Sequence, residues 1–305
     1  MRRGSLLIVR RAAAVALVAT TAIPGIAGPA ADALPPLAPG QSLGIALGIS
    51  AVPNLRDIGG YKTRDGAIVA RGLVFRSGMF DPIGSEDIKK LERLELRNDY
   101  DLRTDTEATA RPDEMPSGVR YALLNVLADA DSAAPAQIEA LLHDPQKANA
   151  TLGGGRIDAM FMQAYRGFVS LPSASRSYRT LFLSLTDRSK LPAVFHCTGG
   201  KDRTGWAAAA LLTLLGVPQE MVIADFLRSN EYLLPQYQRA IDGFIAAGGD
   251  RTIPLAVFGA KAEYLQASFD EMQKRYGTIE RYFSDALGID AAGQRALRDL
   301  YLERQ

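Results

Sequence analysis

The sequence predicts an α/β fold in which a central, mostly parallel sheet is flanked by helices. Two observations support this fold class. Short apolar runs alternate along the chain with longer segments whose apolar residues recur at helical spacing. In addition, a buried strand at 192–196 leads through a glycine-containing loop into an Ala/Leu-rich segment at 204–215 that is apolar on all sides, as a buried helix is.

The first half of the chain supplies most of the expected strands. We expect strands at 72–75, 100–103, 119–126 and 192–196, where apolar or β-prone residues are contiguous. A helix is expected at 85–96, because Ile88, Leu91 and Leu94 recur at helical spacing. Residues 128–155 are polar and Ala-rich and end in three glycines, which predicts a long excursion or flexible loop.

The second half is expected to be mainly helical. Helices are predicted at 157–169, 175–185 and 204–215, and another is opened by Pro218 at its first position and runs to Phe226. Residues 232–305 also show helical patterns, with interruptions expected near Gly248-Gly249 and Pro254.

Composition excludes several classes of protein. Among 305 residues, 47% are hydrophobic and 23% charged, which is ordinary for a globular chain and excludes collagen-like, coiled-coil and fully disordered proteins. The formal net charge of +1 argues against broad nucleic-acid binding. One cysteine allows no internal disulfide, and one cysteine with two histidines makes a Cys/His zinc site a poor hypothesis.

The N-terminus has the features of an export signal. Residues 1–33 combine four arginines, an apolar run from Ala12 to Ile23 and a small-x-small site ending at Ala33, after which we expect cleavage. The apolar run is short for a membrane span, so no stable span is expected after cleavage, although an uncleaved anchor is the alternative. Residues 34–51 are Pro/Gly/Ala-rich and read as a linker, which leaves 52–305 as the catalytic domain of a secreted or periplasmic protein.

The stretch from His196 to Gly205 carries the chemistry. A strand ends at Cys197, a loop with two glycines follows, and a helix begins near Arg203. Backbone amides of a tight loop at a helix N-terminus converge on an anion, and the same field lowers the pKa of a thiol at the rim, so we expect a thiolate at neutral pH. The candidate phosphate-binding residues are His196, Thr198, Gly199, Gly200 and Lys201.

Two further residues of this stretch have expected roles in the reaction. The planar guanidinium of Arg203 matches two equatorial oxygens of a phosphoryl group and gains strength in the transition state. The hydroxyl of Thr204 can donate a hydrogen bond to the sulfur of Cys197 and improve it as a leaving group. Lys201 adds positive charge at the mouth, the alternative being a solvated loop charge.

His-Cys-x5-Arg-Thr resembles the signature loop of the cysteine-dependent protein tyrosine phosphatases, and the fuller form here is similar to that of a secreted bacterial subgroup. Three other stretches fit this subgroup: residues 54–60, 100–103 and 224–230. The resemblance therefore covers roughly residues 52 to 290. It implies a cysteine nucleophile, an arginine clamp, no metal or organic cofactor, and a helical lid after Asn230 with Leu233, Phe244 and Ile245 on its apolar face.

The general acid is the assignment that the resemblance leaves open. The subgroup places it on an Asp-Leu-Arg element, which maps to Asp101; the alternative for Asp101 is a salt bridge with Arg103. The family's usual Trp-Pro-Asp loop is absent, so Asp202 is the rival and Asp105 a distant third. Arg56 and Asp57 are expected to form a structural ion pair that braces the loop.

The resulting hypothesis is a phosphatase that acts on phosphotyrosine, with phosphoserine, phosphothreonine and phosphoinositides as further substrates, and that releases inorganic phosphate. Its partners are then a phosphorylated protein or a phosphoinositide, with no nucleic acid. One alternative is a module that binds phospho-ligands or phosphoinositides without turnover. Another is a sulfur-transfer or arsenate-reducing enzyme, although the loop length and the single cysteine argue against it.

Overall fold

The strands of the computed structural model form a five-stranded sheet and a two-stranded one. The structure describes residues 49, 51–130 and 141–303. The strands are β1 (Arg56–Asp57), β2 (Ile68–Val69), β3 (Val74–Ser77), β4 (Asn98–Asp101), β5 (Arg120–Leu123), β6 (Ala193–His196) and β7 (Leu302–Glu303). The larger sheet has the order β1-β3-β6-β4-β5, with only β1 antiparallel to its neighbour. The predicted mostly parallel sheet is confirmed.

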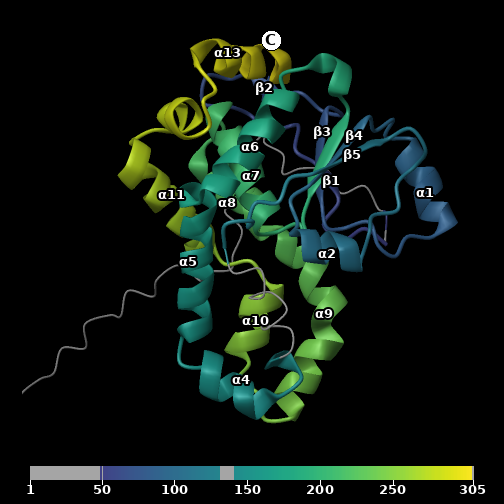
Figure 1. The fold of residues 1–305 in the computed structure, drawn as a ribbon, viewed down its shortest axis with the longest axis vertical. Helices are drawn as coiled ribbons and strands as arrows, with labels where there is room; N and C mark the ends of the chain where they lie inside the picture. Colours follow the sequence, from purple (N-terminus) through teal and green to yellow (C-terminus); the bar gives the residue numbers. More distant parts are fainter. Residues whose placement is uncertain (1–48, 50, 131–140, 304–305) are drawn as a thin grey trace, which may run out of the picture. The chain divides into compact units, whose positions relative to one another are not determined.

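The helices cover both faces of this sheet. They are α1 (Ser85–Glu92), α2 (Asp105–Ala110), α4 (Pro145–Leu152), α5 (Arg156–Ser170), α6 (Pro172–Ser184), α7 (Arg203–Leu214), α8 (Gln219–Leu227), α9 (Ser229–Ala246), α10 (Thr252–Phe258), α11 (Ala262–Tyr276), α12 (Ile279–Arg281) and α13 (Ala291–Tyr301). Figure 1 shows α1 beside one face and α5 to α8 beside the other. No helix in the described ranges is both long enough and apolar enough to cross a membrane.

Two apolar cores lie on the two faces of the sheet. The larger contains Phe195, Cys197 and the buried residues of α5 to α8 and α11. The smaller contains Val194 and Leu91 of α1. Successive residues of β6 therefore point to opposite cores, and the whole strand is buried, as expected for a central parallel strand.

The loop prediction for 128–155 needs correction. Residues 131–140 lie outside the described part of the chain, but α4 occupies 145–152 within the predicted loop. Asp144 caps this helix by accepting a hydrogen bond from the amide of Lys147, and Pro145 occupies its first turn. An Asp-Pro pair is a known signal for a helix start. The prediction gave more weight to the low hydrophobicity of the segment, and therefore placed a loop here. The predicted signal segment, and nearly all of the predicted linker, also lie outside the described residues.

Two predicted helix boundaries are also displaced. Pro254 does not interrupt the helical region but lies in the first turn of α10, where a missing amide hydrogen is tolerated. The second break falls instead at Gly259, after which α11 begins. Pro218 is the N-cap of α8 rather than its first helical residue.

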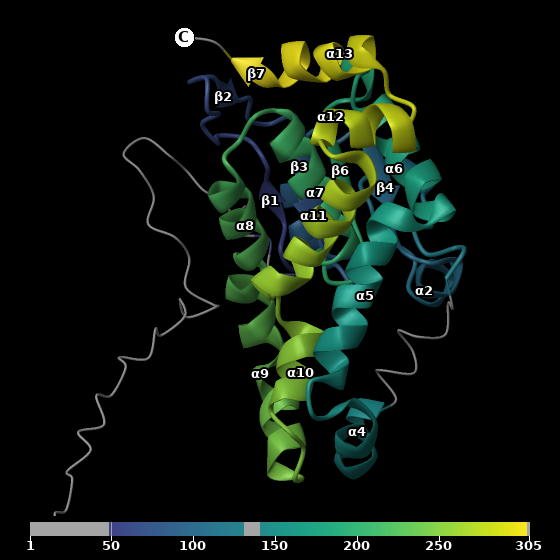
Figure 2. The same cartoon turned by 90° about the vertical axis from the view of Figure 1, so that its left-hand side faces the viewer.

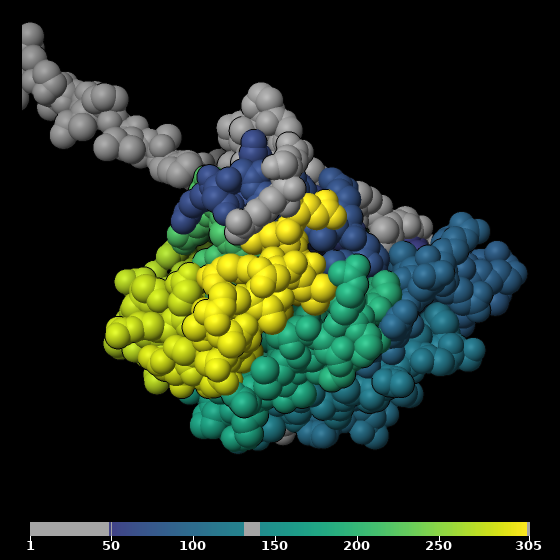
Figure 3. All heavy atoms as spheres, turned by 90° about the horizontal axis from the view of Figure 1, so that it is seen from above, coloured from purple at the N-terminus to yellow at the C-terminus, as the bar shows by residue number. Residues whose placement is uncertain are grey.

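The C-terminal residues close the fold by pairing with an early segment. Strand β7 is antiparallel to β2, with Val69 opposite Leu302. Figure 3 shows these C-terminal residues against the residues near 60–70, and Figure 2 shows α13 leading into β7. These two-residue strands, like β1, are too short to leave a periodic signal in sequence.

Candidate active site

Cys197 lies at the carboxyl end of the central strand β6, between β3 and β4. Residues 198–202 form the loop that leads into α7, which begins at Arg203. The first turn of α7 is buried, and the Oη of Tyr178 donates to the carbonyl of Arg203 at 3.0 Å. The side chain of Cys197 belongs to the core that α7 covers. The strand-loop-helix expected from sequence is therefore present.

The carbonyl oxygens of residues 198–200 are all held from outside the loop. The amide of Met79 donates to the first at 3.2 Å. The side-chain amide of Asn54 donates to the next two at 3.2 and 2.9 Å, and Arg76 donates to the carbonyl of Gly200 at 2.9 Å. Because the C=O and N–H of a trans peptide point in opposite directions, the following amides are turned toward the inside of the loop. In the described part of the chain, none of the amides of residues 198–203 donates to another backbone group.

Glycine is required at one position of this loop. Gly200 has a φ of +67°, in the left-handed region that other residues rarely adopt. A Cβ atom there would also collide with the carbonyl oxygen of Ser77 at the end of β3. The loop thus packs against the neighbouring strand at a distance that only glycine allows.

A buried ionic cluster of Asp225, Arg56 and Arg76 packs against the loop, and Arg76 contacts the loop directly. Asp225 of α8 pairs with Arg56 at 3.1 Å and with Arg76 at 2.5 Å, and it accepts a hydrogen bond from Tyr61. Burial disfavours the charge of Asp225, but the two guanidinium groups hold the pKa of this carboxyl well below its usual range. Burial likewise lowers the pKa of Arg76, to about 10.

The predicted pair between Arg56 and Asp57 is wrong. Asp57 instead accepts hydrogen bonds from the backbone amides of Gly59 and Gly72, at 2.7 Å each. Adjacent residues of a strand point to opposite faces, so these two side chains could not easily meet. The partner of Arg56 is Asp225, which lies 169 residues further along the chain.

Arg203 is clamped by a glutamate that sequence reasoning missed. The two terminal nitrogens of its guanidinium donate to the two carboxylate oxygens of Glu107 at 2.7 and 2.9 Å. The hydroxyl of Thr198 donates to the same carboxylate at 2.6 Å. Glu107 also completes a capping box with Thr104 at the start of α2. The Thr-x-x-Glu spacing signals such a helix start, but it does not reveal the partner of the glutamate.

The electrostatic effect of this pair is reciprocal. Burial opposes the charge on Glu107, but Arg203 outweighs it and holds the pKa of the glutamate well below its usual range. Burial also opposes the charge on Arg203, while the Glu107 carboxylate raises its pKa. Both groups are therefore fixed in their charged forms.

Asp101, the first candidate for the acid, is fully buried in an ion pair. Its carboxylate accepts three hydrogen bonds from the side chain of Arg103, at 2.7 to 3.0 Å, and another from Tyr121. It lies beside His196, its register partner, on the sheet face opposite the core that holds Cys197. The contacts of Asp101 are those of the salt-bridge alternative.

Asp202, the rival, lies in the loop and is partly exposed. Its side chain is 25% exposed, and its Oδ1 accepts hydrogen bonds from Tyr165 at 2.7 Å and Lys201 at 2.8 Å. Lys201 is not a solvated charge: it is buried and lies 4.8 Å from the ring centre of Phe161. Asp105 is exposed, and its carboxylate accepts a hydrogen bond from the side-chain amide of Asn125.

Three remaining candidates lie around the nucleophile. The Nδ1 of His196 is 3.5 Å from the carbonyl oxygen of Cys197. The hydroxyl of Thr204 is buried and has no hydrogen-bond partner among the described residues, so the expected bond to sulfur is not formed in this conformation. A Cβ on Gly199 would lie 3.7 Å from Leu233 of α9, which places the first turns of the predicted lid against the loop.

One group of side chains in the described ranges has the spacing of metal ligands: Asp99, Asp113 and His196. Arg103 donates to the oxygen of Asp113 that faces the histidine, at 2.5 Å. A guanidinium already occupies this carboxylate, so the donor set does not favour a resident divalent cation.

These features define a class of enzyme. The inward-turned amides of the loop and the fixed guanidinium that follows them can bind a phosphoryl group. The buried cysteine that precedes the loop can act as the nucleophile toward that group.

Comparison with known proteins identifies the family. Residues 47–303 match the tyrosine phosphatase family. The chain is 30% identical over 252 residues to a tyrosine-protein phosphatase of Cupriavidus necator, covering 82% of this chain and 86% of that protein. It is 29% identical over 274 residues to the triple specificity protein phosphatase PtpB of Mycobacterium tuberculosis, covering 82% and 96%. The chain belongs to the tyrosine phosphatase family and is a protein phosphatase.

Proposed function

We propose that this phosphatase hydrolyses phosphotyrosine through a phosphocysteine intermediate on Cys197. The observation that carries the proposal is the position of Cys197 at the start of a loop with inward-turned amides, which leads to Arg203 at the first residue of α7. The sulfur attacks phosphorus as the bond to the tyrosyl oxygen breaks, and an acid protonates that oxygen. Water then attacks phosphorus, the P–S bond breaks, the same carboxylate takes the proton of the water, and inorganic phosphate leaves.

Asp202 is the better candidate for that acid. It lies in the loop itself, keeps a quarter of its side chain exposed, and accepts the hydrogen bonds of Tyr165 and Lys201 on Oδ1 alone among the described residues. Asp101 would have to leave Arg103 before it could act. We expect Asp202→Ala to lose more activity than Asp101→Ala on substrates with poor leaving groups. The loss in Asp202→Ala should be smaller on substrates with good leaving groups, which need no acid. The reverse order would restore Asp101 as the acid.

Lys201 extends the proposal to other substrates. It adds a second cation beside the loop, which suits substrates with more than one phosphate, and a relative of this chain is named a triple specificity phosphatase. We therefore include phosphoserine, phosphothreonine and phosphoinositides in the substrate range. Turnover of a phosphotyrosine peptide, a phosphoserine peptide and short-chain phosphoinositides tests this range directly. Lys201→Gln is expected to reduce phosphoinositide turnover more than phosphotyrosine turnover.

The test of the reaction itself is the loss of the nucleophile. Hydrolysis of an aryl phosphate should persist in excess chelator. It should disappear in Cys197→Ser, in which the other residues of the phosphate-binding loop are unchanged. Full activity in that variant would refute the mechanism. Tight vanadate binding by the unmodified protein without any turnover would instead support the phospho-ligand-binding module.

We also propose that the protein is exported and cleaved after Ala33. The supporting feature is the arginine-rich, apolar and small-residue pattern of residues 1–33. N-terminal sequencing of the protein recovered outside the producing cell's cytoplasm should begin at Leu34. Recovery of the intact N-terminus in the membrane fraction would favour the uncleaved anchor.

A further inference from the structure

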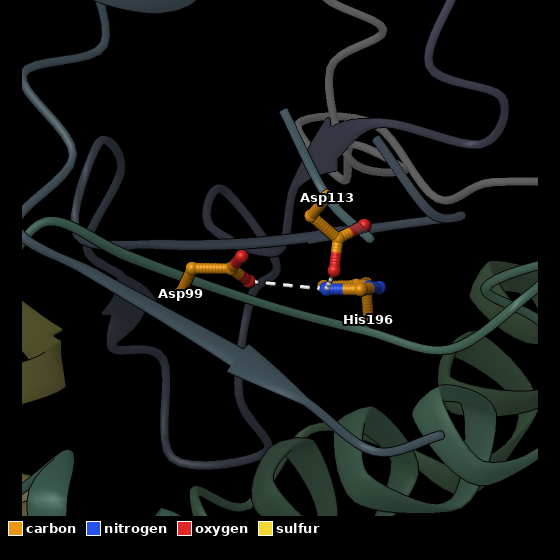
Figure 4. A group of neighbouring side chains, drawn as sticks. All are labelled: Asp99, Asp113 and His196. Carbon is orange, nitrogen blue, oxygen red and sulfur yellow. Dashed lines mark ion pairs between the residues drawn. The ribbon is translucent and has the colours of Figure 1, made fainter. Parts of the chain in front are cut away.

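A cluster of buried charged side chains lies behind the loop, on the face of the sheet away from α7. Asp99 and Asp101 come from β4, His196 from β6, and Asp113 from the segment after α2. Figure 4 shows the two aspartates Asp99 and Asp113 converging on one edge of the imidazole ring. The Nε2 atom of His196 lies 3.1 Å from Asp99 and 3.3 Å from Asp113. All four side chains are 0 to 1% exposed.

Both nitrogens of the imidazole ring face oxygen acceptors. Nε2 lies between the carboxylates of Asp99 and Asp113. Nδ1 faces the carbonyl oxygen of Cys197 at 3.5 Å and the carboxylate of Asp101 at 3.9 Å. A neutral ring has a hydrogen on only one nitrogen, so it would direct a lone pair at one of these oxygens. When the carboxylates are ionised, a ring with hydrogens on both nitrogens suits the whole environment.

The charges in the cluster lead to the same conclusion. Three carboxylates face the ring, and Arg103, which pairs with Asp101 and Asp113, is the cation that neutralises one of them. With a neutral ring, two uncompensated negative charges would be buried together, which is costly. Among the described residues, neither the two oxygens of Asp99 nor the Nε2 of His196 form a hydrogen bond of good geometry, so the two groups meet as an ion pair at 3.1 Å.

We propose that Asp99 and Asp113 hold His196 as a buried imidazolium ion, and that this ring orients the peptide that follows Cys197. Burial opposes charge on the ring, but the two carboxylates raise the pKa of His196 well above its usual value. Burial also raises the pKa of Asp99, so its own charge depends on that of the ring.

The consequence for the active site follows from peptide geometry. An N–H on Nδ1 attracts the carbonyl oxygen of Cys197 toward the cluster. The amide of Thr198, which shares that peptide plane, then points the opposite way, into the loop. Asp99 and Asp113 are thus positioning residues that act through His196. This step rests on the proposed function, whereas the charge of the ring does not.

The charge can be measured directly, because the chain has only two histidines. In protein labelled with ¹⁵N-histidine, NMR of the ring nitrogens distinguishes an imidazolium from either neutral tautomer, and His143→Gln assigns the two signals. We expect His196 to keep both ring hydrogens at pH 7 and above. Asp99→Asn should make it lose one at lower pH, whereas the exposed-site control Asp299→Asn should not.

Kinetics test the consequence. Asp99→Asn should lower kcat/KM about tenfold, because the His196 ring loses a partner that orients it. The pH profile of kcat/KM should also shift. Circular dichroism and the melting temperature show whether the variant is folded. If Asp99→Asn fails to fold, Asp113→Asn tests the same ring from its other partner.

Three results would overturn the proposal. The first is a neutral His196 at pH 7 in the unmodified protein. The second is a ring signal that changes on chelation together with a stoichiometric metal in elemental analysis, which would make the cluster a metal site. The third is an unchanged pH profile in both asparagine variants. A doubly protonated His196 in a protein without phosphatase activity would instead uphold the charge and refute the proposed function.

Discussion

The ion pair between Arg203 and Glu107 allows a quantitative prediction for Glu107→Gln. The glutamate accepts two hydrogen bonds from the guanidinium and one from Thr198. Glutamine keeps the shape but loses the charge, and its amide nitrogen must face a donor. Removing one partner of a buried pair costs about 3–5 kcal/mol. Because 20% of the Glu107 side chain is exposed, we expect the lower end, about 3 kcal/mol.

That loss is measurable by unfolding. For a chain of this size it corresponds to a melting temperature lower by about 6–12 °C. Arg203 would also be less well fixed, and the loss of about 2 kcal/mol of transition-state stabilisation would lower kcat/KM about 30-fold.

The control is Glu92→Gln, which neutralises an exposed glutamate at the end of α1. Its unfolding free energy should change by less than about 0.5 kcal/mol. The reasoning is refuted if Glu107→Gln unfolds within about 1 kcal/mol of the unmodified protein and retains its kcat/KM. In that case Arg203 is held by the loop backbone alone.

Two further substitutions test the support of the loop. Gly200→Ala forces a side chain against the Ser77 carbonyl at a positive φ, so vanadate binding should be lost, and unimpaired binding would contradict the packing described. Asp225→Asn should destabilise the fold by about 3–5 kcal/mol at neutral pH, since Arg56 and Arg76 lose their shared anion. Because the pKa of Asp225 is lowered on folding, its contribution is present above the usual carboxyl value and lost as pH falls below it. Urea unfolding at several pH values should therefore show the two proteins converging in acid, and a constant difference would refute that origin.

Much of the fold could be predicted because its signals are local. The strand at 192–196 and the helix after it are apolar over most of their length, and α5 and α6 were placed to within three residues. Helix α4 was missed because its sequence is polar and has no clear apolar periodicity, so the N-cap at Asp144 was not recognised. The short strands β1, β2 and β7 depend on pairing with distant segments, which no local pattern reports.

The site was only partly predictable for the same reason. The candidates from His196 to Thr204 are contiguous, so the chemistry of a cysteine and an arginine on one loop is visible in the sequence alone. Their roles in catalysis remain predictions to be tested. Asp101 was readily placed on a strand, but its burial against Arg103 depends on the packing of the whole face.

The sequence by itself therefore determined the loop, its lone cysteine and the family resemblance. It could do so because Cys197 and Arg203 are only six residues apart and lie at the two ends of the same loop. The tertiary structure alone decided which charges face each other. Glu107 reaches Arg203 across 96 residues, and Asn54 reaches the loop across 146. Such partners are selected by burial, because a charge or carbonyl withdrawn from water must find a counterpart wherever the fold brings one.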